Sequence, residues 1–221
     1  MNNPDQITAS ADTVLQTLFR TPLVVNLSDS DDFEVQPGVH SSVYINLKAL
    51  ASSSGSRQVV SDILAAKIKP MQPDYICGME IGGCYFASSV ADILLKDLFF
   101  YRKVTKKYNI KNCFAGNVPK KGASVVIIDD VLSSGNTLSG AVNELVSMGC
   151  RVRVVCIFSY CWEEQISHNL NVPVSALCNA EDLMSFGVRH QKMTHLNTKL
   201  IREYIAREES RIVDSAKQGV L

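Results

Sequence analysis

Short apolar runs alternate with amphipathic segments over most of the chain. Residues 124–128, Ser-Val-Val-Ile-Ile, form a β-branched run that is typical of a buried central strand. Similar runs, which we also predict to be strands, occur at 75–77, 98–101, 151–158 and 174–177. Apolar residues at helical spacing lie between them, most clearly over 82–95 and 137–148. This alternation predicts an α/β fold with a central, mostly parallel sheet flanked by helices.

The N-terminal quarter has a different pattern. Apolar residues at i, i+3 and i+4 from Ser10 predict a helix that Thr21-Pro22 closes. Two short strand-like runs, 33–35 and 43–47, are separated by a turn at Gly38 and predict a hairpin. The chain continues with a predicted helix over 59–68, and helical spacing returns in the tail over 197–213.

Composition excludes several classes of protein. The 22 basic and 22 acidic residues among 221 give a formal charge of +0, so no global field attracts nucleic acid or anionic lipid. No apolar run approaches the roughly 20 residues of a membrane helix, and the N-terminus does not resemble a secretion signal. Seven cysteines without a CxxC pair indicate a reducing compartment, and we expect a cytoplasmic protein. The four histidines show no metal-ligand spacing.

The most informative segment begins where the central run ends. Asp129 and Asp130 follow it directly and lead into the small, hydroxyl-rich loop Ser133, Ser134, Gly135, Asn136 and Thr137, which opens a helix. Such a loop offers backbone N–H groups and hydroxyls to a phosphate at a helix N-terminus. Paired carboxylates suit sugar hydroxyls and a Mg²⁺ ion, so the segment predicts a site for a magnesium-bound sugar phosphate. The alternative is a helix cap followed by a solvated turn.

This segment resembles the phosphoribosyl pyrophosphate (PRPP) motif of type I phosphoribosyltransferases. Three further segments are similar to those of orotate phosphoribosyltransferases, in the family's order: the base-binding segment over 38–47, the pyrophosphate loop over 78–87, and the flexible catalytic loop, Arg-Lys-Val-Thr-Lys-Lys-Tyr, over 102–108. The similarity extends over about residues 10 to 185. It implies one phosphoribosyltransferase domain over 1–221, with a small N-terminal hood over 10–50, a PRPP-binding core over 57–185 and a C-terminal helix over 197–214.

The resemblance also implies roles for individual residues. Lys106 is the expected catalytic residue, together with Asp129 and Asp130, which would hold Mg²⁺ indirectly. The expected PRPP-binding residues are Arg102, Lys103, Lys106, Tyr108, Asp129, Asp130, Ser133, Ser134, Gly135, Asn136, Thr137, Gly82 and Gly83. Tyr44, Ile45 and Tyr160 are the expected base-binding residues.

The implied reaction displaces pyrophosphate from PRPP by a ring nitrogen of a base. Negative charge develops on the leaving pyrophosphate, where the cations Arg102, Lys103 and Lys106 would stabilise it. The family forms homodimers in which this loop reaches into the partner's site, so we expect a dimer. A solvated lysine-rich surface is the alternative interpretation of the loop.

Departures from the family pattern concern the base. Where the family has Asp-Arg after the strand that ends near Phe158, this chain has Ser159-Tyr160, so a cation expected to bind the orotate carboxylate is missing. Gln36 stands where a lysine is common, and Asn109 replaces a glycine of the catalytic loop. Three functions therefore stay open: an orotate phosphoribosyltransferase, a phosphoribosyltransferase for another base, and a PRPP-binding regulator without turnover.

Overall fold

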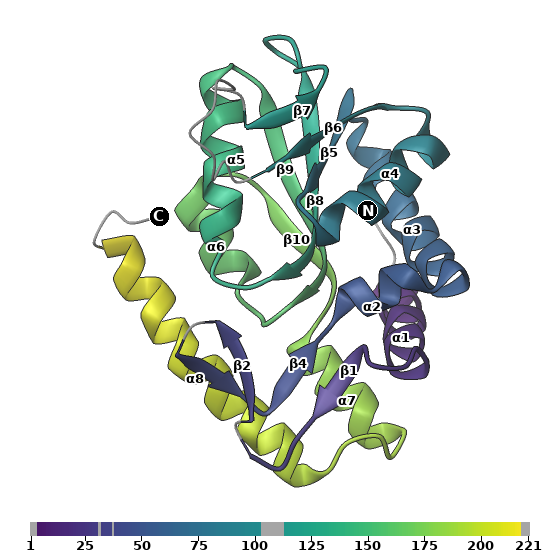
Figure 1. Cartoon of the computed structure of the whole chain (residues 1–221), viewed down its shortest axis with the longest axis vertical. Helices are drawn as coiled ribbons and strands as arrows, with labels where there is room; N and C mark the ends of the chain where they lie inside the picture. Colours follow the sequence, from purple (N-terminus) through teal and green to yellow (C-terminus); the bar gives the residue numbers. More distant parts are fainter. Residues whose placement is uncertain (1–3, 31, 37, 103–112, 218–221) are drawn as a thin grey trace.

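The computed structural model describes residues 4–30, 32–36, 38–102 and 113–217 (Figure 1). The helices are α1 Pro4–Arg20, α2 Leu47–Ser52, α3 Ser54–Ile68, the 3₁₀ turn η1 Lys69–Met71, α4 Gly82–Leu94, α5 Asn136–Ser147, α6 Glu163–Leu170, α7 Ala180–Arg189 and α8 His195–Lys217. The strands are β1 Val25–Leu27, β2 Phe33–Gln36, β3 Val39–Ser41, β4 Val43–Ile45, β5 Tyr75–Met79, β6 Asp97–Tyr101, β7 Phe114–Gly116, β8 Ser124–Leu132, β9 Arg151–Ser159 and β10 Val174–Asn179.

A six-stranded sheet in the order β10-β9-β8-β5-β6-β7 forms the centre of the molecule. All neighbouring strands pair in parallel except β7, which pairs antiparallel with β6. Helices α1, α3 and α4 lie on one side of the sheet and α5 and α6 on the other, which confirms the predicted fold class (Figure 1). Because both faces are covered, Val125 to Ile128 of β8 are fully buried.

The predicted hairpin between 33–35 and 43–47 is wrong. β2 pairs instead with β3, whereas β4 pairs with β1, a strand that the sequence pattern did not reveal. The chain leaves β4 at Ile45, and Asn46 accepts a hydrogen bond from the Ala49 backbone N–H and begins α2. These two small sheets lie beside α8 at the end of the molecule where the parallel strands β5, β8 and β9 finish (Figure 1).

The predicted loop over 102–122 contains the short strand β7. Its pairing with β6 places Tyr101 opposite Phe114, and the backbone N–H of Arg102 donates to the carbonyl of Cys113 at 2.9 Å. Sheet hydrogen bonds therefore hold together the residues on either side of the segment 103–112. That segment, with the predicted site residues Lys103, Lys106 and Tyr108, lies outside the described residues.

Candidate active site

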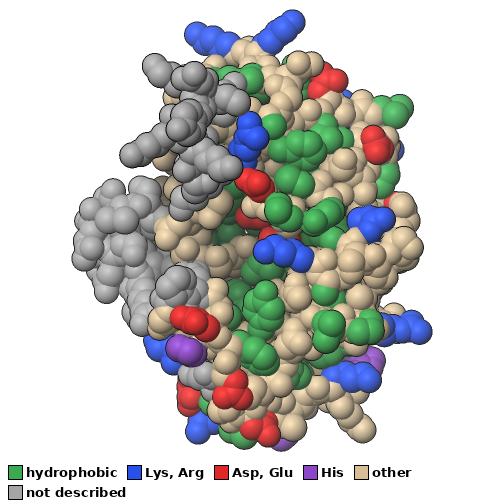
Figure 2. All heavy atoms as spheres, in the orientation of Figure 1, with side chains coloured by type: hydrophobic (Ala, Val, Ile, Leu, Met, Phe, Trp, Pro, Cys, Tyr) green, Lys and Arg blue, Asp and Glu red, His purple; other side chains and the backbone are tan. Residues whose placement is uncertain are grey.

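The carboxyl ends of β5, β8 and β9 meet at one edge of the sheet, where ligands bind in open α/β folds. Helix α2 packs against both α4 and β8 and thereby brings residues 46–48 to the same edge. Figure 2 shows a hollow near the middle of the visible face, with acidic side chains inside it and hydrophobic side chains around it.

Strand β8 continues through the two aspartates to Leu132 instead of ending before them. The backbone N–H of Asp130 donates to Asp129 Oδ1 at 2.9 Å, and the N–H of Val131 donates to Asp130 Oδ1 at 2.9 Å. Burial raises the pKa of Asp129 well above its ordinary value, and the charge of Asp130 raises it further, whereas Lys48 acts in the opposite direction. A cation or a set of hydrogen-bond donors at this point would favour the ionised carboxylate and lower its pKa.

Two glycines allow the start of α4 to lie directly against β8. A Cβ atom on Gly82 would overlap the carboxylate of Asp130, and one on Gly83 would overlap the carbonyl oxygen of Ile128 and lie 3.0 Å from Asp129 Cα. The backbone can approach this closely only where no side chain intervenes. The loop after β5 and the aspartates of β8 therefore form one continuous surface.

A third glycine forms the turn between β8 and α5. Gly135 has φ +79°, a left-handed conformation that favours glycine, and a Cβ there would lie 3.1 Å from Cγ2 of the buried Ile166. No side chain caps α5, so within this described loop the first backbone N–H groups of the helix stay available to a ligand. This arrangement fits an anion at the helix N-terminus.

These elements enclose a cavity of about 200 Å³, which we call the loop chamber. It is lined by Lys48, Glu80, Ile81, Gly82, Asp129, Asp130, Val131, Ser133, Gly135, Thr137 and Leu138. The lining includes three carboxylates, Glu80, Asp129 and Asp130, and residues of the turn that begins α5, so the chamber offers both oxygen ligands and hydrogen-bond donors.

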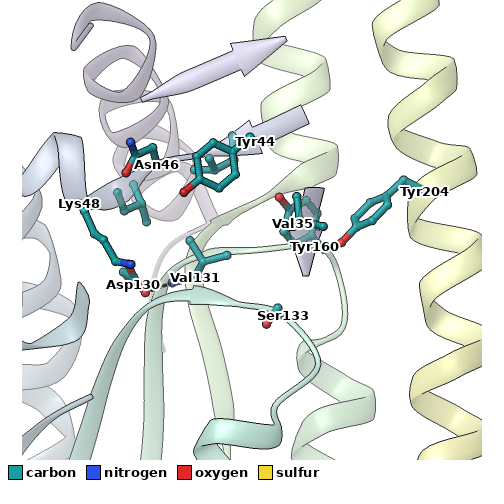
Figure 3. Close-up of a pocket in the computed structure, with 11 residues that line it drawn as sticks. Val35, Tyr44, Asn46, Lys48, Asp130, Val131, Ser133, Tyr160 and Tyr204 are labelled. Carbon is teal, nitrogen blue, oxygen red and sulfur yellow. Dashed lines mark hydrogen bonds between the residues drawn. The ribbon is translucent and has the colours of Figure 1, made fainter. Parts of the chain in front are cut away.

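A second cavity of about 280 Å³, the aromatic chamber, adjoins the first and shares Lys48, Asp130, Val131 and Ser133 with it. Its other lining residues are Val35, Tyr44, Ile45, Asn46, Leu47, Tyr160 and Tyr204 (Figure 3). They come from the small N-terminal sheets, α2, the end of β9 and α8. The two chambers form a continuous cleft with a polar half and an aromatic half.

The aromatic wall is a packed set of rings. Tyr160 is 4% exposed and its ring lies 5.3 Å from Phe158, 5.5 Å from Trp162 and 5.3 Å from Tyr204, centroid to centroid. Tyr44 is 38% exposed and faces the open cavity. A flat ligand could stack against such a wall. Trp162 is buried and packs against Tyr160 without lining the chamber.

The structure brings most of the predicted residues together. Asp129, Asp130, Ser133, Gly135, Thr137 and Gly82 line the loop chamber, and Tyr44, Ile45 and Tyr160 line the aromatic chamber. Ser134, Asn136 and Gly83 belong to the same loops without lining either cavity, and Arg102 lies exposed at the end of β6. Sequence reasoning missed Lys48, Glu80 and Tyr204, because an isolated lysine, glutamate or helical tyrosine carries no local signal.

Thiol chemistry does not fit this site. Cys84 lies at the start of α4, and burial, together with Glu80 and the two aspartates, raises the pKa of its thiol to about 11. It therefore stays protonated near neutral pH. Among the described residues, no group of three His, Cys, Asp or Glu side chains is arranged to hold a metal ion by protein ligands alone.

Residues 46–165 match the model of the phosphoribosyl transferase domain family, which is more than half of the chain and includes every lining residue of the loop chamber. The chain belongs to the phosphoribosyltransferase family. This agrees with the resemblance seen in its sequence motifs, and it makes the cleft between β5, β8 and β9 the candidate active site of a phosphoribosyltransferase.

Three similar proteins illustrate how far the likeness extends. An orotate phosphoribosyltransferase of Archaeoglobus fulgidus is 31% identical over 124 residues, which cover 56% of this chain and 69% of the relative. One of Staphylothermus marinus is 28% identical over 180 residues, or 80% of this chain and 88% of the relative. The structure of Leishmania donovani UMP synthase matches with a TM-score of 0.76 and 22% identity, covering 90% of this chain. This phosphoribosyltransferase spans only 43% of the length of that synthase.

Proposed function

We propose that the chain is an orotate phosphoribosyltransferase of pyrimidine biosynthesis. It would transfer the phosphoribosyl group of PRPP to a ring nitrogen of orotate and release orotidine 5′-monophosphate and pyrophosphate. The observation that carries this proposal is the junction of the two chambers at Asp130 and Ser133, because the reaction needs a sugar phosphate and a flat base on either side of one carbon atom. The relatives named above support orotate as the base.

The residues of the loop chamber have distinct tasks in this reaction. The N-terminus of α5 and the hydroxyls of Ser133 and Thr137 would bind the 5′-phosphate, and Asp129 and Asp130 would accept hydrogen bonds from the ribose hydroxyls. The backbone beside Gly82 would face the pyrophosphate. During transfer the bond from ribose carbon 1 to the pyrophosphate oxygen breaks with its electron pair on oxygen, and a bond to the base nitrogen forms.

Magnesium is part of the proposal. The carboxylates of Asp129, Asp130 and Glu80 in one chamber are the hard oxygen ligands that Mg²⁺ prefers, and this ion usually binds through one or two carboxylates, waters and substrate phosphates. When bound, it would neutralise charge on the departing pyrophosphate. Lys106, with Arg102 and Lys103, would stabilise the same charge.

A homodimer that shares this loop between sites is a further part of the proposal. Exposed apolar side chains on and beside α3 and α4, including Val59 (38% exposed), Ile81 (51%) and Tyr85 (46%), support an interface on this side of the molecule. Mixing a Lys106→Ala chain with an Asp129→Asn, Asp130→Asn chain tests it. Shared sites regain activity in the mixture, whereas self-contained sites stay inactive.

We also propose that the protein acts in the reducing cytoplasm. All seven cysteines lie in the described residues and all are free thiols. Among the described helices, none has the length and apolar character needed to cross a membrane.

Pyrophosphate release from PRPP and Mg²⁺ is the test of the function. The purified chain is assayed with orotate, uracil, hypoxanthine, adenine and nicotinate. Release with orotate supports the proposal. Release with another base favours the second candidate, which Tyr160 in place of the family's arginine keeps open. Binding of PRPP without release from any base would indicate a regulatory protein.

A further inference from the structure

The aromatic chamber contains one cation among its lining residues, Lys48. Its remaining lining is apolar, aromatic or neutral except for Asp130, which is an anion. An acidic ligand would therefore be repelled by Asp130 and attracted only by Lys48. Among the described residues that line this cavity, Lys48 is therefore the one whose charge favours a negatively charged base.

The position of Lys48 is fixed by its backbone. Asn46 caps α2 through a 3.3 Å hydrogen bond from the Ala49 N–H to Asn46 Oδ1, so the first turn of the helix is held beside β4. The helix packs on α4 and β8, which directs the Lys48 side chain toward the junction of the two chambers, near Asp130 (Figure 3). Lys48 is exposed, and within the described residues no salt bridge or hydrogen bond holds its ammonium group. It is free to bind a ligand.

A second basic residue near the aromatic wall is already engaged. Arg207 lies 5.7 Å from the centroid of the Tyr204 ring, donates to the carbonyl of His40 and lies 3.8 Å from Glu208. It contacts Tyr204 without lining the chamber. Arg102, at the end of β6, lines neither chamber.

We infer that Lys48 binds the acid group of the acceptor base and thereby selects a carboxylated ring over a neutral one. Tyr160 occupies the position of the missing arginine, and the cation is supplied from the opposite wall, at the start of α2. The inference rests on the proposed function, because it names the residue that recognises the orotate carboxylate.

The test compares two acceptors and three variants of the full chain. Orotate and uracil share one ring and differ in the carboxylate. Lys48→Met keeps most of the side-chain length without the charge, Lys48→Arg keeps the charge, and Lys69→Met, an exposed lysine that lines neither chamber, is the control. The KM values for orotate, uracil and PRPP are measured for each by pyrophosphate release.

We expect Lys48→Met to raise the KM for orotate by roughly tenfold to a hundredfold, the range of a charge-assisted hydrogen bond. The readout is the ratio of the KM for orotate to the KM for uracil, because a loss in the loop chamber, which Lys48 also lines, affects both acceptors alike. Lys48→Arg restores most of the preference for orotate, and Lys69→Met behaves as the unchanged chain. An equal loss with both acceptors, or a rise confined to the KM for PRPP, would overturn the inference and assign Lys48 to PRPP binding alone.

A second measurement distinguishes a failure of the proposed function from a failure of the inference about Lys48. If the unchanged chain releases no pyrophosphate with orotate, binding of orotate and of uracil is measured by calorimetry with the same variants. Tighter binding of orotate that Lys48→Met abolishes still supports the role of Lys48. Equal binding of the two rings would overturn it.

Discussion

Gly82, in the first turn of α4, lies so close to Asp130 of β8 that a methyl group on the glycine would overlap the carboxylate oxygens. Replacing it with alanine must displace either the carboxylate or the loop after β5. We expect Gly82→Ala to cost about 1–3 kcal/mol of stability and to weaken PRPP binding at least tenfold. Thermal unfolding and calorimetric titration with PRPP measure the two effects.

Gly55→Ala is the matched control. Gly55 lies in the first turn of α3, nothing lies within 4 Å of an added Cβ, and alanine favours helix by up to about 1 kcal/mol. This variant should be at least as stable as the unchanged chain and should bind PRPP equally. Unchanged PRPP affinity in Gly82→Ala would show that the contact with Asp130 does not shape the site.

The raised pKa of Asp129 predicts that the carboxylate proposed to bind PRPP lowers the stability of the ligand-free protein. Because burial raises this pKa above its ordinary value of 3.8, ionising the carboxyl destabilises the ligand-free fold by about 1.4 kcal/mol per pKa unit. Below about pH 3.8 the residue is protonated in both folded and unfolded chains and has no such cost. The cost grows as the pH rises and is complete above the folded-state pKa.

Asp129→Asn should therefore raise the melting temperature near neutral pH, with a gain that disappears as the pH falls toward 3.8. The same substitution should abolish measurable PRPP binding, since the ribose hydroxyls lose a carboxylate acceptor. Melting curves from pH 4 to pH 8 measure the gain, with the exposed Asp92→Asn as the control. A melting temperature lowered equally at every pH would contradict the prediction.

The catalytic loop can be tested through two neighbouring lysines. Lys106→Ala should lower kcat by about two orders of magnitude or more, because its charge acts mainly on the departing pyrophosphate. PRPP binding should stay measurable. The adjacent Lys107→Ala removes the same charge from the segment and should change kcat by a few-fold only. Similar kcat values for the two variants would mean that net charge, and not Lys106, accounts for the effect.

Tyr204 links the C-terminal helix to the acceptor half of the cleft. Its ring lies 5.3 Å from Tyr160 and 6.2 Å from Trp162, so Tyr204→Ala should destabilise the fold by about 3–5 kcal/mol and loosen the wall of the aromatic chamber. The KM for the base should rise more than the KM for PRPP. Trp162, the single tryptophan of the chain, reports the repacking through its fluorescence. A proportional rise in both KM values would place the effect in overall stability instead.

The central part of the fold could be predicted because its signals are local. The apolar run of β8, the two aspartates and the hydroxyl-rich turn are contiguous, and the parallel strands around them alternate with helical patterns. α6 escaped detection since Ile166 and Leu170 are its only buried residues and the rest of the helix is polar. The three-residue strands β1 and β4 pair across a long intervening segment, so neither periodicity nor turn chemistry indicates their register.

The candidate site likewise has one part with local sequence signals and one part that only the tertiary structure brings together. Most of the loop chamber comes from segments with recognisable motifs, which predict Gly82, Asp129, Asp130, Ser133, Gly135 and Thr137 but neither Lys48 nor Glu80. The aromatic chamber is assembled from five separate parts of the chain, and Lys48 and Tyr204 acquire their significance only through packing. A lysine after a short strand or a tyrosine in a polar helix is ordinarily a surface residue, and only the tertiary structure distinguishes these two.

The hydrogen bond between Arg102 and Cys113 has a consequence for how this enzyme could change over evolution or by engineering. Because the sheet closes both ends of the segment 103–112, residues inserted there need not disturb the strands on either side. The entropic cost of closing such a segment grows only slowly, by roughly 0.6 kcal/mol for each doubling of its length. If Lys106 has the role proposed for it, changes in the length and sequence of this one segment will alter turnover at little cost to the stability of the sheet.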